Sequence, residues 1–320
     1  MATVDREEII VSKAYESACD FSWTPNLTEP APSGIINVNI EHAPEFIKSC
    51  GYTSNNYVLV SQRSDLGLAY QKEYPVRMDM KKWITMLPHM DLIDFENLGY
   101  DKLVIPPRCD VNKCNMTDNY AIKCDSFTWS TVPQIPPNIK RWHMTNCMTD
   151  EPHISGIPFG VLDDESADKL CEIPAMDKTG WLYVNFQTYT LERFYLKGSL
   201  GSQASSCEWM TFVAAAKSIE DYFKDIAQHR YVICPDGNGV DCFRTWESLY
   251  LGSIPIVKRS RTTEQFSDLP ILLVDDLFSI TIELLEEKYE EILLKKDNLE
   301  QAKLSYWKNI FKESKNENCN

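Results

Sequence analysis

Residues 231–257 read Tyr231-Val-Ile-Cys-Pro-Asp-Gly-Asn-Gly-Val-Asp-Cys-Phe-Arg-Thr-Trp-Glu-Ser-Leu-Tyr-Leu-Gly-Ser-Ile-Pro-Ile-Val257. The short apolar run from Tyr231 to Cys234, halted by Pro235, is typical of a buried strand in a parallel sheet. The segment 236–239 predicts a turn, because Gly and Asn tolerate positive φ and let the backbone approach a ligand. The whole stretch therefore predicts a βαβ unit that binds a ligand at its first turn.

The helix of this unit has clear start and stop signals. Asp241 is a natural N-cap residue, and Gly252 is a typical residue just after a helix that runs through Tyr250. Arg244 and Glu247 are three residues apart, so they share one face near the N-terminal turn. A cation and a carboxylate would then lie beside the positive end of the helix dipole, at the carboxyl end of a strand. Open α/β sheets bind phosphorylated ligands at that place.

Composition limits the class of protein and its partners. The chain has 320 residues, which favours two domains of roughly 150 residues each. A net charge of -15 argues against nucleic acid or an anionic membrane as the main partner. The start of the chain lacks a signal-peptide pattern, and no apolar run approaches the roughly 20 residues of a spanning helix. We therefore expect a soluble, cytoplasmic protein whose 11 cysteines are mostly reduced thiols.

Alternating strand and helix patterns run through both halves of the chain. In the first half we expect strands at 34–40, 55–61, 101–107, 138–146 and 153–160, and a helix around 80–90. In the second half we expect strands at 181–186, 231–234, 254–257 and 270–276, and helices at 218–228, at 241–250 and over 281–311 with a break near 297–298. Such alternation predicts an α/β protein with parallel, doubly wound sheets. The acidic segment 163–168 is the best place for a domain boundary.

Several common cofactor motifs are absent from the sequence. Cys242 stands where a dinucleotide-binding GxGxxG fingerprint needs its third Gly, and no GxxxxGK[ST] occurs, so NAD and P-loop ATP sites are weak hypotheses. Cys109, Cys114 and Cys124 lack the spacing of a zinc site. We expect neither a metal nor a cofactor.

Each candidate ligand-binding residue also has a plain structural interpretation. Arg244 can bond a pyrophosphate with two donors, and Glu247 can accept both hydroxyls of a ribose. Alternatively, the two form an exposed ion pair worth about 0.3 kcal/mol. Arg193 follows the strand at 181–186 and is the second candidate cation, although such an arginine is more often a surface residue. A Gly-rich turn is likewise often only a connection.

The second half of the chain resembles the donor half of exostosin-like glycosyltransferases. The resemblance is strong over residues 180 to 276 and weaker upstream. It rests on Leu182-Tyr-Val-Asn-Phe186 with Arg193, Tyr222 to Pro235, Gly237-Asn-Gly239, Phe243 to Gly252 and Ile254-Pro-Ile-Val257, and upstream on Tyr57 to Asp65, Trp142 to Asn146 and Ile157 to Gly160. Within that family the chain is similar to short, anchorless members of large algal viruses and microbes, among them xylosyltransferases. For a viral member the compartment would be the host cytosol.

This resemblance implies a GT-B fold, in which two Rossmann-like domains face each other across a cleft. We expect an acceptor-binding domain at 1–165 and a nucleotide-sugar-binding domain at 166–300. The remaining segment, 301–320, would be a C-terminal helix that packs back on the first domain and a frayed tail.

The resemblance further implies an inverting transfer from a nucleotide-diphosphate sugar to a hydroxyl of a glycan or glycoprotein acceptor, without an obligatory metal. UDP-xylose or another UDP-sugar is the first guess for the donor. The residues expected to bind the donor are Arg193, Gly237, Asn238, Gly239, Arg244 and Glu247. Asp65 is the candidate base, since it follows a predicted strand at the cleft edge, although it could equally cap the next turn. Secondary candidates, for the acceptor or the base, are His143, Asn146, His153 and Lys258.

Two other classes of function remain open from the sequence. One is a noncatalytic nucleotide- or carbohydrate-binding module that keeps this fold without turnover. The other is a GT-B phosphorylase or an epimerase, which the sequence favours less because it offers no lysine setting suited to a pyridoxal Schiff base.

Overall fold

The computed structural model describes residues 4–62, 115–116, 122–123, 135–149, 151–188, 190–237 and 239–317. Residues 1–70 and 131–320 form one compact unit, and residues 71–130 form a second. The described residues of the second unit form a short antiparallel pair of strands, β4 (Asn115–Met116) and β5 (Ile122–Lys123). The predicted strand at 101–107 and helix around 80–90 lie outside the described residues.

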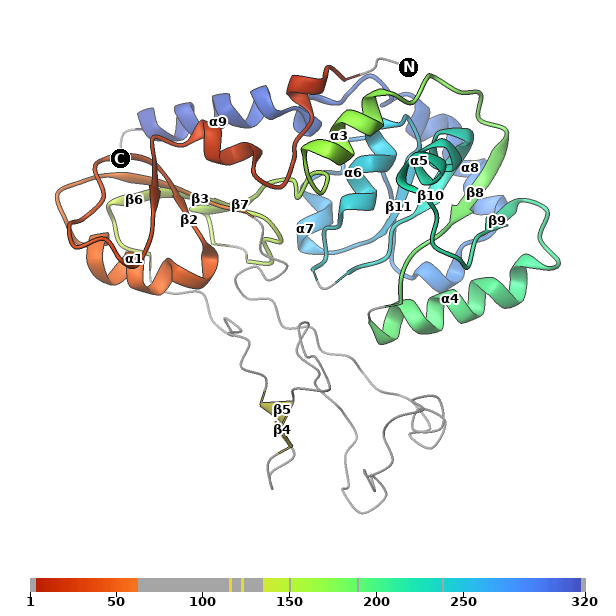
Figure 1. Cartoon of the computed structure of the whole chain (residues 1–320), viewed down its shortest axis with the longest axis horizontal. Helices are drawn as coiled ribbons and strands as arrows, with labels where there is room; N and C mark the ends of the chain where they lie inside the picture. The colour runs from red at the N-terminus through yellow and green to blue at the C-terminus, as the bar shows by residue number, and fades with distance from the viewer. Residues whose placement is uncertain are drawn as a thin grey trace. The chain divides into compact units, whose positions relative to one another are not determined.

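The first unit is an α/β structure with two parallel-strand sheets, consistent with a two-domain Rossmann-like fold (Figure 1). The predicted fold class is confirmed at this level. The first sheet has the order β1-β2-β3-β6-β7. Its strands are β1 (Phe21–Trp23), β2 (Gly34–Val38), β3 (Tyr57–Ser61), β6 (Ile139–Met144) and β7 (Ile154–Gly156). The sequence pattern missed β1, because a strand of three residues in a proline-broken segment has no measurable period.

Helices cover both faces of the first sheet. Helix α1 (Ala43–Cys50) places Phe46 edge-on to Trp23 of β1 and Tyr57 of β3. On the other face, residues of β2 and β3 such as Val58 share a core with Phe311 of the C-terminal helix α9 (Leu304–Asn316). Helix α9 contacts β2, β3 and β6. The last helix of the chain therefore closes the core of its first sheet.

The second sheet has the order β12-β11-β10-β8-β9 and is also parallel throughout. Its strands are β8 (Gly180–Val184), β9 (Met210–Phe212), β10 (His229–Ile233), β11 (Ile254–Lys258) and β12 (Leu272–Val274). Its helices are α3 (Asp164–Cys171), α4 (Leu191–Ala204), α5 (Ile219–Gln228), α6 (Phe243–Tyr250), α7 (Arg261–Glu264) and α8 (Ile282–Leu293). The predicted interruption of the 281–311 helix lies between α8 and α9, around a short 3-10 turn at Glu300–Ala302.

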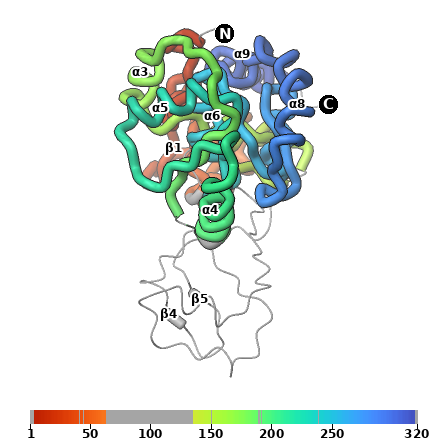
Figure 2. The backbone as a smooth tube through the Cα atoms, turned by 90° about the vertical axis from the view of Figure 1, so that its right-hand side faces the viewer, coloured from red at the N-terminus to blue at the C-terminus, as the bar shows by residue number. Residues whose placement is uncertain are grey.

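Alternate residues of the second sheet face two separate cores. Tyr183 and Val232 pack with residues of α5 and α6, such as Trp246. Leu182 and Tyr231 pack with residues of α4 and α8 on the opposite face. In Figure 2, α5 and α8 lie on opposite sides of this part of the chain. Because strands buried on both faces must be apolar throughout, this layering explains the continuous apolar runs in the sequence.

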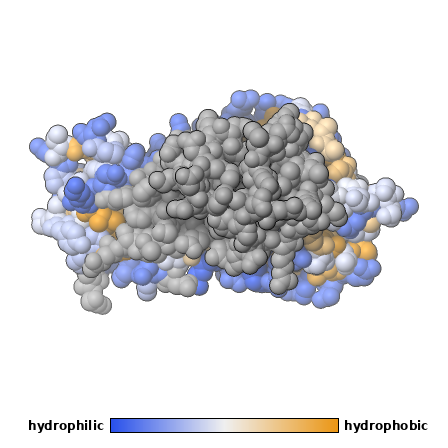
Figure 3. All heavy atoms as spheres, turned by 90° about the horizontal axis from the view of Figure 1, so that it is seen from below, coloured by the Kyte–Doolittle hydropathy of each residue, from blue (hydrophilic) through white to orange (hydrophobic). Residues whose placement is uncertain are grey.

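The described surface carries both polar and apolar side chains. Hydrophilic side chains predominate on the described part of the face that Figure 3 shows, and hydrophobic colour is confined to separate areas. Large exposed apolar side chains are spread over different elements, for example Tyr52 after α1, Phe194 on α4 and Leu294 after α8. None of the described helices is long and apolar enough to span a membrane.

Candidate functional site at the strand reversal of the second sheet

The candidate site lies where the strand order of the second sheet reverses. From β8 the chain goes outward to β9, and then returns to place β10 on the other side of β8. The loops that leave the carboxyl ends of β8 and β10 therefore diverge from neighbouring strands. Such a reversal opens a crevice at the carboxyl edge, which is where open α/β sheets bind their ligands. Arg193 follows one of these loops, and the Gly-rich turn forms the other.

Arg193 holds the Gly-rich turn through its guanidinium group. Its Nε donates to the carbonyl of Asp236 at 2.8 Å, and its Nη2 donates to the carbonyl of Pro235 at 2.8 Å. A longer bond of 3.4 Å joins Nη1 to the carbonyl of Gln187 in the loop after β8. The side chain is only 6% exposed, so Arg193 is not the surface residue that the alternative interpretation assumed. Its donors tie the two diverging loops together.

The turn itself is tight and close to the arginine. The Gly237 amide donates to the carbonyl of Gly239 at 2.8 Å. A Cβ at Gly237 would lie 3.3 Å from Nη2 of Arg193, which is closer than side-chain contacts normally come. Glycine at this position therefore lets the backbone approach the guanidinium. Asn238, the remaining predicted residue of the turn, lies outside the described residues.

The start of α6 differs from the prediction. Its N-cap residue is Cys242, and no side chain caps the helix. The predicted cap, Asp241, is instead buried, and its carboxylate accepts from the amide of Phe159 at 2.8 Å and from the indole of Trp246 at 2.9 Å. The Asp241 amide in turn donates to the side chain of Asn146 at 2.8 Å. Asp241 thus joins the turn after β10 to the loops after β6 and β7.

The end of α6 is as predicted, with Gly252 just after the helix at a φ of 70°.

Arg244 and Glu247 lie on the first turns of α6, and Tyr222 of α5 contacts both. The Tyr222 hydroxyl donates to Oε2 of Glu247 at 2.9 Å, and the Arg244 guanidinium lies 5.8 Å from the centre of the Tyr222 ring. Glu247 is 8% exposed, and the buried Nε of Arg244 has no hydrogen-bond partner within the described part of the chain. No ion pair joins Arg244 to Glu247, so the alternative of an exposed pair is wrong. A shared tyrosine holds them instead.

Burial and close charges together determine the electrostatics of the site. Burial lowers the pKa of Arg193, and the nearby Arg244 cation lowers it further. Because the ordinary pKa of arginine exceeds 12, both guanidinium groups remain charged. Burial also raises the pKa of Glu247, while the Arg244 charge and the Tyr222 hydroxyl oppose that rise. The Asp236 carboxylate acts on Arg193 in the opposite direction, so two guanidinium groups and the carboxylates of Glu247 and Asp236 share the carboxyl edge of the sheet.

Lys258 lies at the same edge, at the end of β11. Its Nζ pairs with Oε1 of Glu192 at 3.0 Å, in the first turn of α4. The lysine side chain is 41% exposed and the carboxylate 18% exposed. Lys258 is therefore close in the fold to the segment that carries Arg193, but it is already paired with a carboxylate.

The secondary candidates of the first sheet occupy different surroundings. His143 is buried on β6, with Nδ1 2.7 Å from the Ser155 hydroxyl and Nε2 3.1 Å from the Ser314 hydroxyl of α9. Burial lowers its pKa to about 4. Asn146 is also buried and has a φ of 55°. His153 is exposed before β7. The chain itself thus surrounds His143 and Asn146, whereas His153 faces solvent.

Asp65, the candidate base, and the cysteines at 109, 114 and 124 lie outside the described residues. Within the described ranges, no three His, Cys, Asp or Glu side chains are grouped so that they could hold a metal ion. Sequence reasoning assigned no role to Tyr222 and took Asp241 for a simple cap. The helical pattern of α5 places Tyr222 near its start, but only the packing of α5 on α6 brings its hydroxyl to Glu247.

A comparison with known protein families gives one match that covers the site. Residues 183–316 match the RXYLT1 C-terminal domain, a xylosyltransferase-related family. The matched segment contains Arg193, the Gly-rich turn, Arg244 and Glu247. No curated protein matches the chain. The family match supports a glycosyltransferase-like protein, and it gives no support to the comparison with viral members.

Proposed function

We propose that the protein is an inverting glycosyltransferase that uses a nucleotide-diphosphate sugar and acts without a metal. The observation that carries the proposal is the convergence of Arg193 and Arg244 at the strand reversal, beside the Gly-rich turn that Arg193 holds through the carbonyls of Pro235 and Asp236. A leaving diphosphate develops negative charge, and two preorganised guanidinium groups would stabilise it. The match to a xylosyltransferase-related family supports a glycosyltransferase-like function in general.

The roles of the individual residues follow from their chemistry. Arg244 has an Nε without a described partner, so it can bond a phosphate oxygen without losing an existing bond. Arg193 already donates to three carbonyls, and we assign it to shaping the turn as well as to adding charge. Glu247 would accept the ribose hydroxyls, with Tyr222 fixing its orientation. Gly239 and Asn238 complete the turn in this proposal.

The acceptor side rests on the residues of the first half. We retain Asp65 as the base that takes the proton from the acceptor hydroxyl while the bond from the anomeric carbon to the diphosphate breaks. In this proposal the chain has a GT-B arrangement, with an acceptor-binding part at 1–165 and a donor-binding part at 166–300. The helix at 301–320 contributes to the core of the acceptor part. UDP-xylose is our first choice of donor and a glycan hydroxyl our choice of acceptor.

A thermal-shift experiment with UDP in the presence of EDTA tests the donor site. We expect UDP to raise the melting temperature, because a ligand that binds only the native state stabilises it. Arg244→Ala should remove most of this shift, whereas Arg259→Ala should retain it, since Arg259 is an exposed arginine paired with Asp275. Absence of a shift at millimolar UDP and GDP would refute the proposal.

A transfer assay with a panel of UDP-sugars separates an enzyme from a binding module. We expect sugar release from at least one donor, with UDP-xylose the first to test. Asp65→Asn should abolish transfer and leave the UDP-induced shift unchanged. A protein that binds UDP and leaves every donor intact would instead be the noncatalytic module, and an active Asp65→Asn enzyme would show that another group is the base.

A further inference from the structure

A pocket lies at the edge of the second sheet opposite the candidate donor site. Three segments that precede parallel strands line it. Lys178 comes shortly before β8, Ala227 lies near the end of α5 just before β10, and Gly252 comes shortly before β11. The amino ends of parallel strands share one edge of the sheet, so the pocket is separated from the Gly-rich turn by the length of the strands.

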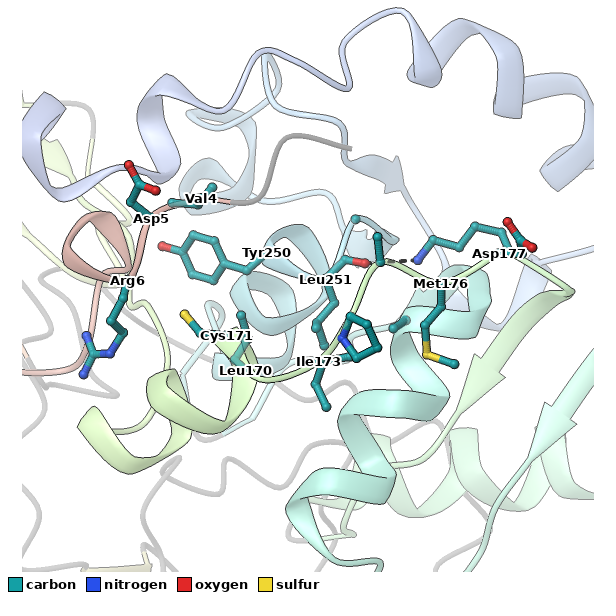
Figure 4. Close-up of a pocket in the computed structure, with 15 residues that line it drawn as sticks. Val4, Asp5, Arg6, Leu170, Cys171, Ile173, Met176, Asp177, Tyr250 and Leu251 are labelled. Atoms are coloured by element: carbon teal, nitrogen blue, oxygen red, sulfur yellow. Dashed lines mark hydrogen bonds between the residues drawn. The ribbon is translucent and has the colours of Figure 1, made fainter.

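The walls of this pocket are mainly apolar. Its volume is about 640 Å³, which falls in the range of small-molecule sites. Figure 4 shows Leu170 and Ile173 from the region of α3, and Tyr250 and Leu251 from the end of α6, arranged around it. Met176 lines the same cavity. A ligand with an apolar body would fit these walls.

Lys178 is a half-buried cation in this lining. Its Nζ donates to the carbonyl of Leu251 at 3.1 Å and to the hydroxyl of Ser253 at 2.7 Å. The Ser253 hydroxyl gives its own hydrogen to the carbonyl of Ile226, so it can only accept from the lysine. These two acceptors use two of the three hydrogens of an ammonium group. One donor is left for a ligand.

The charges around the pocket leave Lys178 without a counter-ion. Arg6 is paired with Asp164 and Asp168. Asp5 and Asp177 are exposed at the rim, where solvent weakens their repulsion of an anion. Lys178 forms no ion pair with a carboxylate in the described ranges, and burial lowers its pKa to about 7. A carboxylate from outside would compensate a cation that the chain itself does not neutralise.

We propose that this pocket is a second ligand site, which binds a small carboxylate with an apolar body. The carboxylate accepts a charge-assisted hydrogen bond from Nζ of Lys178, and the hydrocarbon part covers the walls formed by Leu170, Ile173 and Leu251. This site is independent of the nucleotide site, because it lies at the other edge of the sheet and shares no residue with it.

Octanoate and 1-octanol are matched probes for this site, since they share a hydrocarbon chain and differ in charge. Titration calorimetry at about pH 6, where the amine is protonated, should show octanoate binding on the order of tenfold more tightly than 1-octanol. Lys178→Met should reduce octanoate binding to the level of 1-octanol and leave 1-octanol unchanged. Equal binding of both probes to the native protein would overturn the proposal, as would full octanoate binding by Lys178→Met.

A second variant keeps the test decisive if Lys178→Met does not fold. Ala175 is an exposed residue of the lining, so Ala175→Trp fills the mouth of the pocket without disturbing the core. This variant retains Lys178, and it should bind both octanoate and 1-octanol at least tenfold more weakly than the native protein. UDP should not displace octanoate; displacement, or unchanged binding by Ala175→Trp, would place octanoate elsewhere and contradict the assignment. Loss of UDP binding alone would refute the glycosyltransferase proposal and not this one.

Discussion

The two parallel sheets use the same local elements and differ in their strand order. In the first sheet the order β1-β2-β3-β6-β7 follows the chain without a reversal. In the second, β10 returns to the opposite side of β8 from β9, and the loops on either side of that reversal diverge. Described polar groups at the carboxyl edge of the first sheet, such as Asn146, bond to other parts of the chain. At the reversal Arg193 likewise bonds to carbonyls of the chain, but there a second guanidinium group, that of Arg244, lies near it.

This difference teaches that the position of a ligand site depends on connectivity more than on composition. Both sheets have apolar strands and polar loops, and both carry arginine. Arg141 on β6 pairs with Glu317 and donates to the Pro152 carbonyl, so its charge is compensated locally. The buried Nε of Arg244, by comparison, has no hydrogen-bond partner in the described ranges. The comparison can therefore be tested by making the same kind of substitution near each sheet and measuring which one affects activity or UDP binding.

The largest expected effect is the loss of transfer in Arg193→Ala. Removal of a preorganised donor to a developing oxyanion typically costs about 10²- to 10³-fold in rate, and the turn would also lose two carbonyl contacts. Arg141→Ala, the matched change in the first sheet, should retain activity within about threefold, since an exposed ion pair contributes roughly 0–1 kcal/mol. Steady-state rates of both variants with the best donor measure this contrast. Equal losses would mean that the reversal has no special role.

The junction between the sheets should show an unusual pH dependence. Burial raises the pKa of Asp241 to about 7, against an ordinary value of 3.8. Between these values the native state binds more protons than the unfolded state, so the free energy of unfolding should fall as pH rises from about 4 to 7. Asp241→Asn removes this dependence, and it should cost about 1–3 kcal/mol because its amide group would face the N–H donors of Phe159 and Trp246.

Urea unfolding of the native protein and Asp241→Asn over this pH range tests that prediction. The stability difference between the two proteins should be greatest near pH 4 and smaller near pH 7. A difference that grows with pH would show that the carboxylate is ionised in the native state throughout. In that case the hydrogen bonds from Phe159 and Trp246 would outweigh the cost of burial.

The smallest expected effects come from a pair of glycine substitutions, one in the turn after β10 of the second sheet and one in β7 of the first. Gly237→Ala should reduce UDP affinity by about three- to tenfold, or about 1 kcal/mol, with a smaller effect on stability, because its Cβ would meet Nη2 of Arg193 at 3.3 Å and displace a guanidinium that is otherwise fixed on the turn. Gly156→Ala should instead lower the stability of the protein and leave its UDP affinity nearly unchanged. Its Cβ would lie 2.5 Å from Oε1 of Gln265, which accepts the Gly156 amide hydrogen. Thermal unfolding with and without UDP distinguishes the two outcomes, and a matching response of both variants would contradict the comparison.

Much of the fold could be predicted from periodic apolar runs. The strands near 57–61, 139–144 and 229–233 are close to their predicted positions, as are α5 and the interruption before α9. The very short strands β1 and β9 escaped prediction, because three residues carry no reliable period. Helix α4 was also not predicted, since its Gly198 and Gly201 weaken the helical pattern.

The candidate site was predictable in its parts and not in its contacts. The chemistry of Arg244 and Glu247 at the start of a helix, next to a Gly-rich turn, is visible in the sequence. Asp241 could not be assigned correctly, because an aspartate before a helix is normally a cap, and only its bonds to Phe159 and Trp246 show otherwise. The pocket at Lys178 left no sequence signal, since its lining comes from segments far apart in the chain.

By itself, the sequence determined the α/β class of the fold and the approximate positions of most strands and of α5, α6, α8 and α9, and it singled out the residues that we propose for nucleotide binding. These properties depend on local periodicity and on residue type. Only the tertiary structure decided that β10 lies beside β8, which brings Arg193 to the turn at Gly237. It also decided that Tyr222 holds Glu247. The physical reason is that strand order and helix packing follow from burial of the whole chain, which no local pattern records.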